Sequence, residues 1–129
     1  MAIGRVDDLK HGVGDFRFVS GNAYNGNFRL DKKNGHGVFR WTSGETYDGH
    51  WVDDRKHGLG RTIFQDGSEY SGDYFEDLME GEGRMTYTNG DVYKGDFVDG
   101  ARYGHGELTF ASGDVYEGQF IAGAMQGRG

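Results

Sequence analysis

Apolar and polar residues alternate along two short stretches of this sequence, and the whole pattern returns every 23 residues. In the unit 35–57, the first stretch carries Phe39 and Trp41 on one face, and the second carries Tyr47 and Trp51. A period of two with aromatic and β-branched residues predicts β-strands. No segment shows the 3.6-residue period of a helix, so we expect at least ten short antiparallel strands and almost no helix.

Aromatic residues and glycines occupy the recurring positions in a fixed order. A tyrosine is followed two residues later by a glycine and four residues later by a large aromatic residue. A short fixed period indicates an array of units that bury their apolar faces against one another. We therefore expect residues 1–129 to form one array of about five repeats, with partial units at both ends. The recurring positions are Tyr24, Tyr47, Tyr70, Tyr93 and Tyr116; Gly26, Gly49, Gly72, Gly95 and Gly118; and Phe28, Trp51, Tyr74, Phe97 and Phe120.

The two stretches of a unit are separated by a turn signal such as Thr42-Ser43-Gly44, which predicts a β-hairpin. A three-residue loop would place Phe39 opposite Tyr47, whereas a five-residue loop would place Phe39 opposite Gly49. The sequence favours the shorter loop, and both keep the aromatic residues on one side. The polar link 52–57 would then lead to the next hairpin. About five hairpins make a twisted ribbon roughly 50 Å long, with rings on one face.

The composition fits a thin sheet. Only 35% of the 129 residues are hydrophobic, but 15% are aromatic and 25 are glycine. Few aliphatic and many aromatic residues suit a single layer, since each ring covers a large area. Glycines such as Gly49 would let rings lie over the backbone. A phosphate-binding role for the Gly-x-Gly pairs is disfavoured, because a third glycine and a following helix are missing.

The sequence offers no arrangement for catalysis. It contains no cysteine, and no nucleophile, base and orienting group fall together. Histidines in equivalent positions lie two or three units apart, which would separate them by roughly 20–30 Å. We therefore expect no enzyme activity, no metal site and no cofactor. With no signal-peptide core and no run of about 20 apolar residues, we expect a cytoplasmic protein.

Charge is distributed unevenly. Residues 1–64 contain 10 Lys or Arg and 8 Asp or Glu, a balance of +2, and residues 65–129 contain 4 and 13, a balance of −9. The acidic half would repel nucleic acid and anionic lipid. Basic pairs occur in two links of the first half, where they are either solvated link residues or contacts for an anionic headgroup: Lys32, Lys33, Arg55 and Lys56.

Apolar residues replace these basic pairs in the later links. They either cover the ring-bearing face as additional core or form a contact patch for a partner, and the sequence leaves both open. The candidate contact residues are Phe75, Leu78, Met79, Tyr103 and Met125.

The pattern Tyr-x-Gly-x-aromatic, a polar link, Gly-x-Gly and Gly-Asp-x-Tyr resembles the MORN repeat (membrane occupation and recognition nexus). Residues 46–51 and 90–97 match it closely, and the resemblance extends over residues 9–129. Thr62 departs from it by occupying an otherwise apolar position. Because the chain ends on Gly127-Arg128-Gly129, the opening of a further unit, we expect it to be a fragment of a longer array.

The resemblance implies an elongated, single-layer antiparallel sheet and a non-catalytic scaffold, often at membrane–cytoskeleton junctions. We expect protein partners, including a second copy of the chain. Repulsion between the acidic halves should make self-association stronger at high salt. Two alternatives remain: a phosphoinositide- or membrane-binding module with weak phospholipid contact, and a targeting module cut from a larger enzyme such as a lipid kinase or a lysine methyltransferase.

Overall fold

A computed structural model of the chain describes residues 4–6 and 9–126. This part of the chain is all-β, as the alternating pattern predicts, and contains no helix. The pair Gly127/Gly129 lies outside the described residues. The strands are β1 (Gly4–Val6), β2 (Leu9–Arg17), β3 (Ala23–Arg29), β4 (Lys32–Arg40), β5 (Thr46–Val52), β6 (Arg55–Ile63), β7 (Glu69–Phe75), β8 (Leu78–Thr86), β9 (Val92–Val98), β10 (Ala101–Thr109), β11 (Val115–Ile121) and β12 (Ala124–Gln126).

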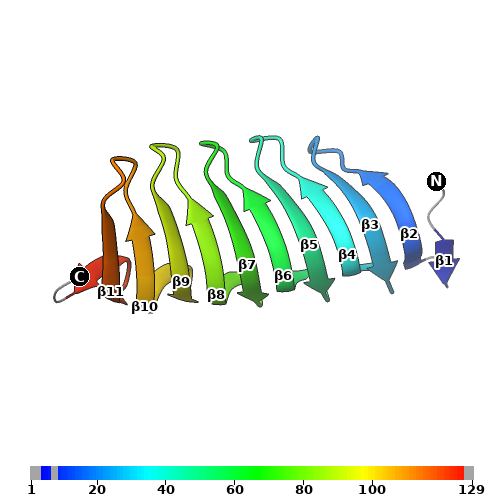
Figure 1. Cartoon of the computed structure of the whole chain (residues 1–129). Helices are drawn as coiled ribbons and strands as arrows, with labels where there is room; N and C mark the ends of the chain where they lie inside the picture. The colour runs from blue at the N-terminus through cyan, green and yellow to red at the C-terminus, as the bar shows by residue number, and fades with distance from the viewer. Residues whose placement is uncertain (1–3, 7–8, 127–129) are drawn as a thin grey trace.

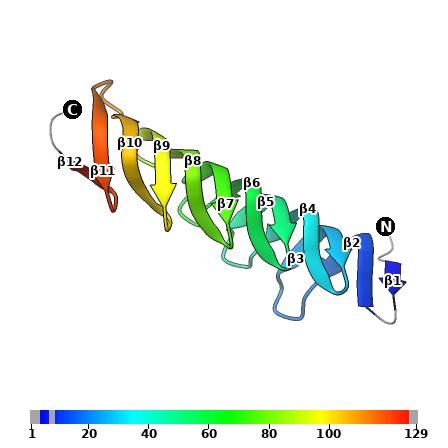
Figure 2. The ribbon, with the colours of Figure 1, turned by 90° about the horizontal axis from the view of Figure 1, so that it is seen from below.

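The strands form one open antiparallel sheet in chain order, each paired with the strand before and after it. The sheet is an elongated ribbon with the two chain ends at opposite ends of it (Figure 1). Loops joining β2 to β3, and the equivalent strands, follow one long side. Tight turns follow the opposite long side. Figure 2 views the ribbon from that side and shows the strands following one another along its length. The predicted elongated single-layer sheet is therefore confirmed.

The hairpin loops have the predicted three-residue form. Phe39 pairs with Tyr47, and the residues that close the loop, Trp41 and Glu45, are joined by a 2.9 Å backbone hydrogen bond. Gly44 ends the loop at a φ of 101°, which a residue with a Cβ rarely adopts. The local turn signal was therefore sufficient to fix the register of these hairpins.

The polar links turn out to be hairpins as well. Asp53 and Asp54 form a two-residue turn between β5 and β6, with φ values of 47° and 71°. Positive φ at both central residues is the geometry of a type I′ turn, whose twist matches that of paired strands. The sequence concealed this turn because the glycine that usually marks it is absent from the first three links.

A row of glycines crosses the sheet at right angles to the strands. Each pairs with the next, as Gly37 does with Gly49 and Gly49 with Gly60. Between this row and the tight turns, alternate strand pairs contain a bulge, as between the pairs Gly49/Gly60 and Trp51/Lys56. The row consists of Gly14, Gly26, Gly37, Gly49, Gly60, Gly72, Gly83, Gly95, Gly106 and Gly118.

The core lies on one face of the sheet, called here the ring-bearing face. The opposite, or outer, face carries polar side chains and some large apolar ones, both exposed to solvent. Because no second layer covers either face, the rings bury one another. The buried apolar residues are Tyr24, Phe28, Phe39, Tyr47, Trp51, Tyr70, Tyr74, Met85, Tyr93, Phe97, Leu108 and Phe120.

Candidate interaction surfaces

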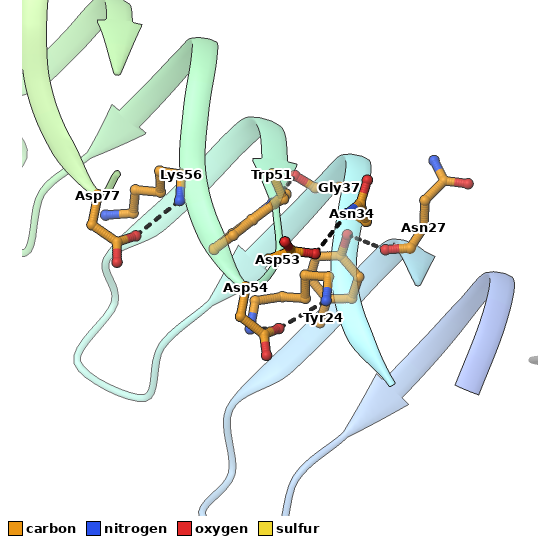
Figure 3. Close-up of polar contacts among 10 residues, drawn as sticks. Tyr24, Asn27, Asn34, Gly37, Trp51, Asp53, Asp54, Lys56 and Asp77 are labelled. Carbon is orange, nitrogen blue, oxygen red and sulfur yellow. Dashed lines mark hydrogen bonds and ion pairs between the residues drawn. The ribbon is translucent and has the colours of Figure 1, made fainter. Parts of the chain in front are cut away.

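The recurring tyrosines lie flat over the glycine row. A Cβ built on Gly37 would come within 2.0 Å of the Tyr24 hydroxyl, so only glycine leaves room for the ring. The Tyr24 hydroxyl donates a 2.8 Å hydrogen bond to the carbonyl oxygen of Asn27, which explains why this position is tyrosine rather than phenylalanine (Figure 3). The predicted role of the glycines is thus visible in the structure: they make space for rings.

Burial changes the ionisation of these phenols. Loss of solvation is the largest cause, and it raises the pKa of Tyr74 and of Tyr93 to about 12. The same cause raises the pKa of Tyr24, Tyr47 and Tyr70 further. The phenols are therefore neutral at any physiological pH and act as structural hydrogen-bond donors.

Aromatic contacts join one repeat to the next. The Tyr47 ring meets Tyr74 edge to face, with 5.1 Å between centroids, and Tyr70 meets Phe97 in the same way at 5.0 Å. Such contacts add about 0.5–1.5 kcal/mol each beyond the area they bury. The rings of the ring-bearing face are consequently engaged with one another along the whole array.

The two basic pairs of the links are divided between the faces. Lys33 pairs with Phe28 and lies on the ring-bearing face, with its Nζ 4.9 Å from the centroid of Trp51 and 3.2 Å from an Asp54 carboxylate oxygen. Its side chain is only 16% exposed. Its neighbour Lys32 is exposed on the outer face. The structure therefore does not bring the pair together as one headgroup site.

The second pair divides in the same way. The Nζ of Lys56 lies over the rings of Trp41 and Tyr74, at 5.1 and 5.6 Å, while Arg55 is exposed on the outer face. Desolvation lowers the pKa of Lys56, and the nearby Glu45 carboxylate counteracts this. Lys33 and Lys56 are thus cations held over aromatic rings, an interaction that stabilises the fold.

A third cation, which was not predicted from the sequence, occupies the same position of a later repeat. Arg102 lies over Phe120 and Tyr93, at 5.2 and 5.7 Å from the ring centroids. Arg102 follows Lys56 by 46 residues, which is two repeat lengths, so the two residues occupy equivalent positions in the sequence. The position is occupied in successive repeats by Lys33, Lys56, Met79, Arg102 and Met125.

Main-chain groups beside the turns are held by carboxylates from the following repeat. Asp54 accepts a 2.8 Å hydrogen bond from the Lys33 amide, and Asp77 does the same for Lys56 (Figure 3). The side-chain Nδ2 of Asn34 also donates a 3.3 Å hydrogen bond to the Asp53 carboxylate. These bonds link successive turns to one another along this edge of the sheet.

The predicted contact residues do not form one patch. Phe75 and Leu78 pair across β7 and β8 on the outer face, where they are 54% and 44% exposed. Met79 and Met125 pair instead with residues of the ring-bearing face, and Tyr103 lies in the bulge of β10. Met79 therefore packs against the core, as one interpretation expects, whereas Phe75 and Leu78 stay candidates for a contact patch.

Phe75 and Leu78 belong to a longer apolar row on the outer face. Each member is the last residue of a strand, or the first of the next, beside a tight turn. Their exposed fractions lie between 41% and 54%. We call this set the apolar row: Val52, Phe75, Leu78, Val98 and Ile121.

The outer face carries cationic side chains where the first repeats begin this row, beside an equal number of acidic ones. Lys32, Arg55 and His57 line a recess together with two acidic residues, Asp53 and Glu76. Arg55 is 3.5 Å from the Glu76 carboxylate, which partly neutralises it. The surface beside the turns thus carries charges of both signs in the first repeats and is more apolar further along the ribbon.

No group of three or more His, Cys, Asp or Glu side chains close enough to bind a metal occurs within the described residues. Nor is any helix in that part of the chain long and apolar enough to span a membrane.

Comparison with protein families matches the MORN repeat at residues 6–23, 24–46, 47–69, 70–92, 93–115 and 116–129. The fold and these matches define a repeat protein of the open β-hairpin type. The chain belongs to the MORN repeat family, whose repeats are generally non-catalytic modules. No curated protein matches the chain.

Proposed function

We propose that this chain is a non-catalytic scaffold that binds protein partners, including a second copy of itself, through its outer face. The observation that carries the proposal is the apolar row. Its five side chains are each more than 40% exposed on a rigid sheet whose other face is occupied by its own rings. Exposed apolar groups arranged in a row are typical of protein contact surfaces. The absence of cysteine and the MORN repeats support a cytoplasmic location at a membrane–cytoskeleton junction as part of this proposal.

The test is a variant that alters the apolar row and leaves the ring-bearing face intact. Phe75→Asp/Leu78→Asp meets this requirement because both side chains point outward, whereas any change at Met79 would also disturb the rings. Light scattering at low and high salt should show wild-type self-association that strengthens with salt, since salt screens repulsion between the acidic halves. The variant should associate at least tenfold more weakly, a difference of about 1.4 kcal/mol.

The matched control is Val13→Asp/Val19→Asp. It adds the same two charges at exposed apolar residues that lie outside the apolar row, one on β2 and one in the loop that follows it. It should associate as the wild type does, apart from the general effect of net charge. Equal weakening by both variants would show that the apolar row is not the contact.

A second candidate function is weak binding of anionic lipid, supported by the recess lined by Lys32, Arg55 and His57. Sedimentation with phosphatidylcholine vesicles, with and without phosphatidylserine or phosphatidylinositol bisphosphate, should show salt-sensitive binding to the anionic vesicles alone. Lys32→Glu/Arg55→Glu should abolish it. The control Arg17→Glu/Arg40→Glu has the same net charge and should retain most of the binding. Loss in both variants would indicate non-specific attraction instead.

A further inference from the structure

Four charged residues on β8 and β9 place like charges opposite each other twice, whereas other strand pairs of the described sheet do so at most once, as Arg29 does with Lys32 and Glu107 with Glu117. Arg84 lies directly opposite Lys94, and Glu82 directly opposite Asp96, so like charges face each other twice across one strand pair. Directly opposed like charges destabilise a sheet. All four side chains are exposed on the outer face, where they line an open recess above Gly83 and Gly95. We call these four residues the charge quartet.

Several other charged residues of the outer face form ion pairs within the chain. His36 is 2.8 Å from Asp48, Arg61 is 2.9 Å from Glu69, and His105 is 3.4 Å from Glu117. Among the described residues, no member of the charge quartet is part of an ion pair, although Lys94 faces Glu107 in the register of β10. The quartet therefore has an unfavourable arrangement within the monomer.

The glycine row separates the two signs. Arg84 and Lys94 lie on the loop side of Gly83 and Gly95, and Glu82 and Asp96 lie on the turn side. A rotation of 180° about an axis along the glycine row would exchange the two sides. It would place each positive pair over a negative pair.

We propose that the charge quartet is the centre of a contact with a second copy of this chain, outer face against outer face, with the two-fold axis along the glycine row. The proposal rests on the self-association proposed above and specifies its geometry. Arg84 then faces Glu82 of the second copy, and Lys94 faces its Asp96, with the two sheets about 10 Å apart. The contact is isologous, as two-fold symmetry requires.

The neighbouring strands fit the same arrangement. On β5 the two sides of the glycine row carry Asp48 and His50, and on β10 they carry Glu107 and His105. No strand from β5 to β11 carries like charges at these two positions. The pairs on the two sides, strand by strand, are Asp48/His50, Arg61/Leu59, Ser71/Asp73, Arg84/Glu82, Lys94/Asp96, Glu107/His105 and Glu117/Gln119.

Apolar side chains also come together under this symmetry. On β9 and β11 the loop-side counterparts of the apolar row are exposed or half-buried valines, whereas the counterparts of Val52 and Phe75 are Thr46 and Glu69. Val98 would face Val92 of the second copy, and Ile121 would face its Val115. The charge quartet thus provides register, and the flanking apolar residues provide buried area.

Salt alone does not test this geometry, because it screens both the net repulsion and the proposed charge pairs. Reversing the sign of charges within the quartet does test it. Variant one is Arg84→Glu/Lys94→Glu, and variant two is Glu82→Arg/Asp96→Lys; each makes all four positions one sign. A third variant carries all four changes. The net-charge control for variant one is Lys32→Glu/Arg40→Glu, at two exposed residues outside the glycine-row flanks.

We expect light scattering to show monomers for variants one and two alone, a one-to-one complex when they are mixed, and restored self-association in the four-change variant. Circular dichroism should show every variant folded, since all positions are exposed. If the wild type associates and neither variant weakens it, this geometry is wrong while the proposed scaffold function stands. If the wild type is monomeric and the mixed variants do not bind, self-association itself is wrong, and capture of other proteins becomes the remaining scaffold role.

Discussion

Thr62 and Tyr74 show how individual residues depart from the repeat without breaking it. Thr62 occupies a position that is apolar in the other repeats, yet it is completely buried. Tyr74 occupies a position where the other repeats have phenylalanine or tryptophan. The two departures compensate for each other, since the Thr62 and Tyr74 hydroxyls form a buried hydrogen bond. Each departure is visible in the sequence, but only the fold shows that they are partners.

Removing both partners should therefore cost less than the sum of removing each one alone. Tyr74→Phe leaves the Thr62 hydroxyl buried without this partner, and we expect a loss of about 1–3 kcal/mol of unfolding free energy. Thr62→Val should lower the unfolding free energy by a similar amount, because it leaves the buried Tyr74 hydroxyl without this hydrogen-bond partner. Urea unfolding of both variants and of Thr62→Val/Tyr74→Phe should give a double variant that is closer to wild type than the sum. Additive losses would contradict the pairing.

At the scale of single elements, the tight turns contain residues in an unfavourable conformation. Leu30 has a φ of 49° and is 49% exposed, so its side chain gains little from burial. A left-handed conformation costs a residue with a Cβ roughly 1–2 kcal/mol. Glycine avoids this cost but loses more conformational entropy on folding.

Leu30→Gly should consequently raise the free energy of unfolding by about 0.5–1 kcal/mol, measured by urea unfolding. The control is Leu59→Gly, at an exposed leucine within β6 whose φ is not positive. It should lower stability by about 0.5–1 kcal/mol. Destabilisation at both positions would mean that Leu30 contributes contacts that outweigh its backbone strain.

Replacing a glycine should have different effects on stability in the glycine row and in a hairpin loop. A Cβ on Gly72 would lie 2.5 Å from the Glu82 carbonyl oxygen and from the Gly83 Cα, both of which are backbone atoms that cannot move aside. Gly113, in a loop at a φ of 99°, has open space around it. Gly72→Ala should therefore cost more than about 3 kcal/mol, and Gly113→Ala about 1–2 kcal/mol. Thermal unfolding measures both; equal losses would show that the row does not require close backbone approach.

At the scale of the whole molecule, the tyrosines link stability to alkaline pH. Burial raises the folded-state pKa of Tyr74 and Tyr93 to about 12, from an unfolded value of 10. The neutral phenol is thus favoured in the folded protein. Its stabilising contribution is complete below about pH 10 and is lost as pH rises through the folded-state pKa.

We expect the urea midpoint to be constant between about pH 7 and pH 9 and to fall steeply between about pH 10 and pH 12. Tyrosinate absorbance should appear together with loss of the β-sheet circular dichroism signal, because each ring binds its neighbours along the array. Ionisation of these tyrosines near pH 10 without unfolding would contradict their burial.

The sequence by itself determined the strands, the hairpin loops, the ring-bearing face and the role of glycines such as Gly37. These features depend on local alternation and turn chemistry, which a 23-residue period repeats until the signal is unmistakable. The turn at Asp53-Asp54 escaped sequence analysis because those residues adopt positive φ only when both strands hold them there. The later link Asp99-Gly100 does carry the usual signal.

The tertiary structure decided which residues meet. It placed Lys33 over rings while Lys32 stayed in solvent, separated Met79 from Leu78, and aligned Arg84 with Lys94 across two strands. Neighbours in sequence point to opposite faces of a strand, whereas neighbours in space come from repeats about 23 residues apart. Which side chains are neighbours on the surface of this protein is therefore set by the register between strands, and the sequence of a single repeat does not predict it.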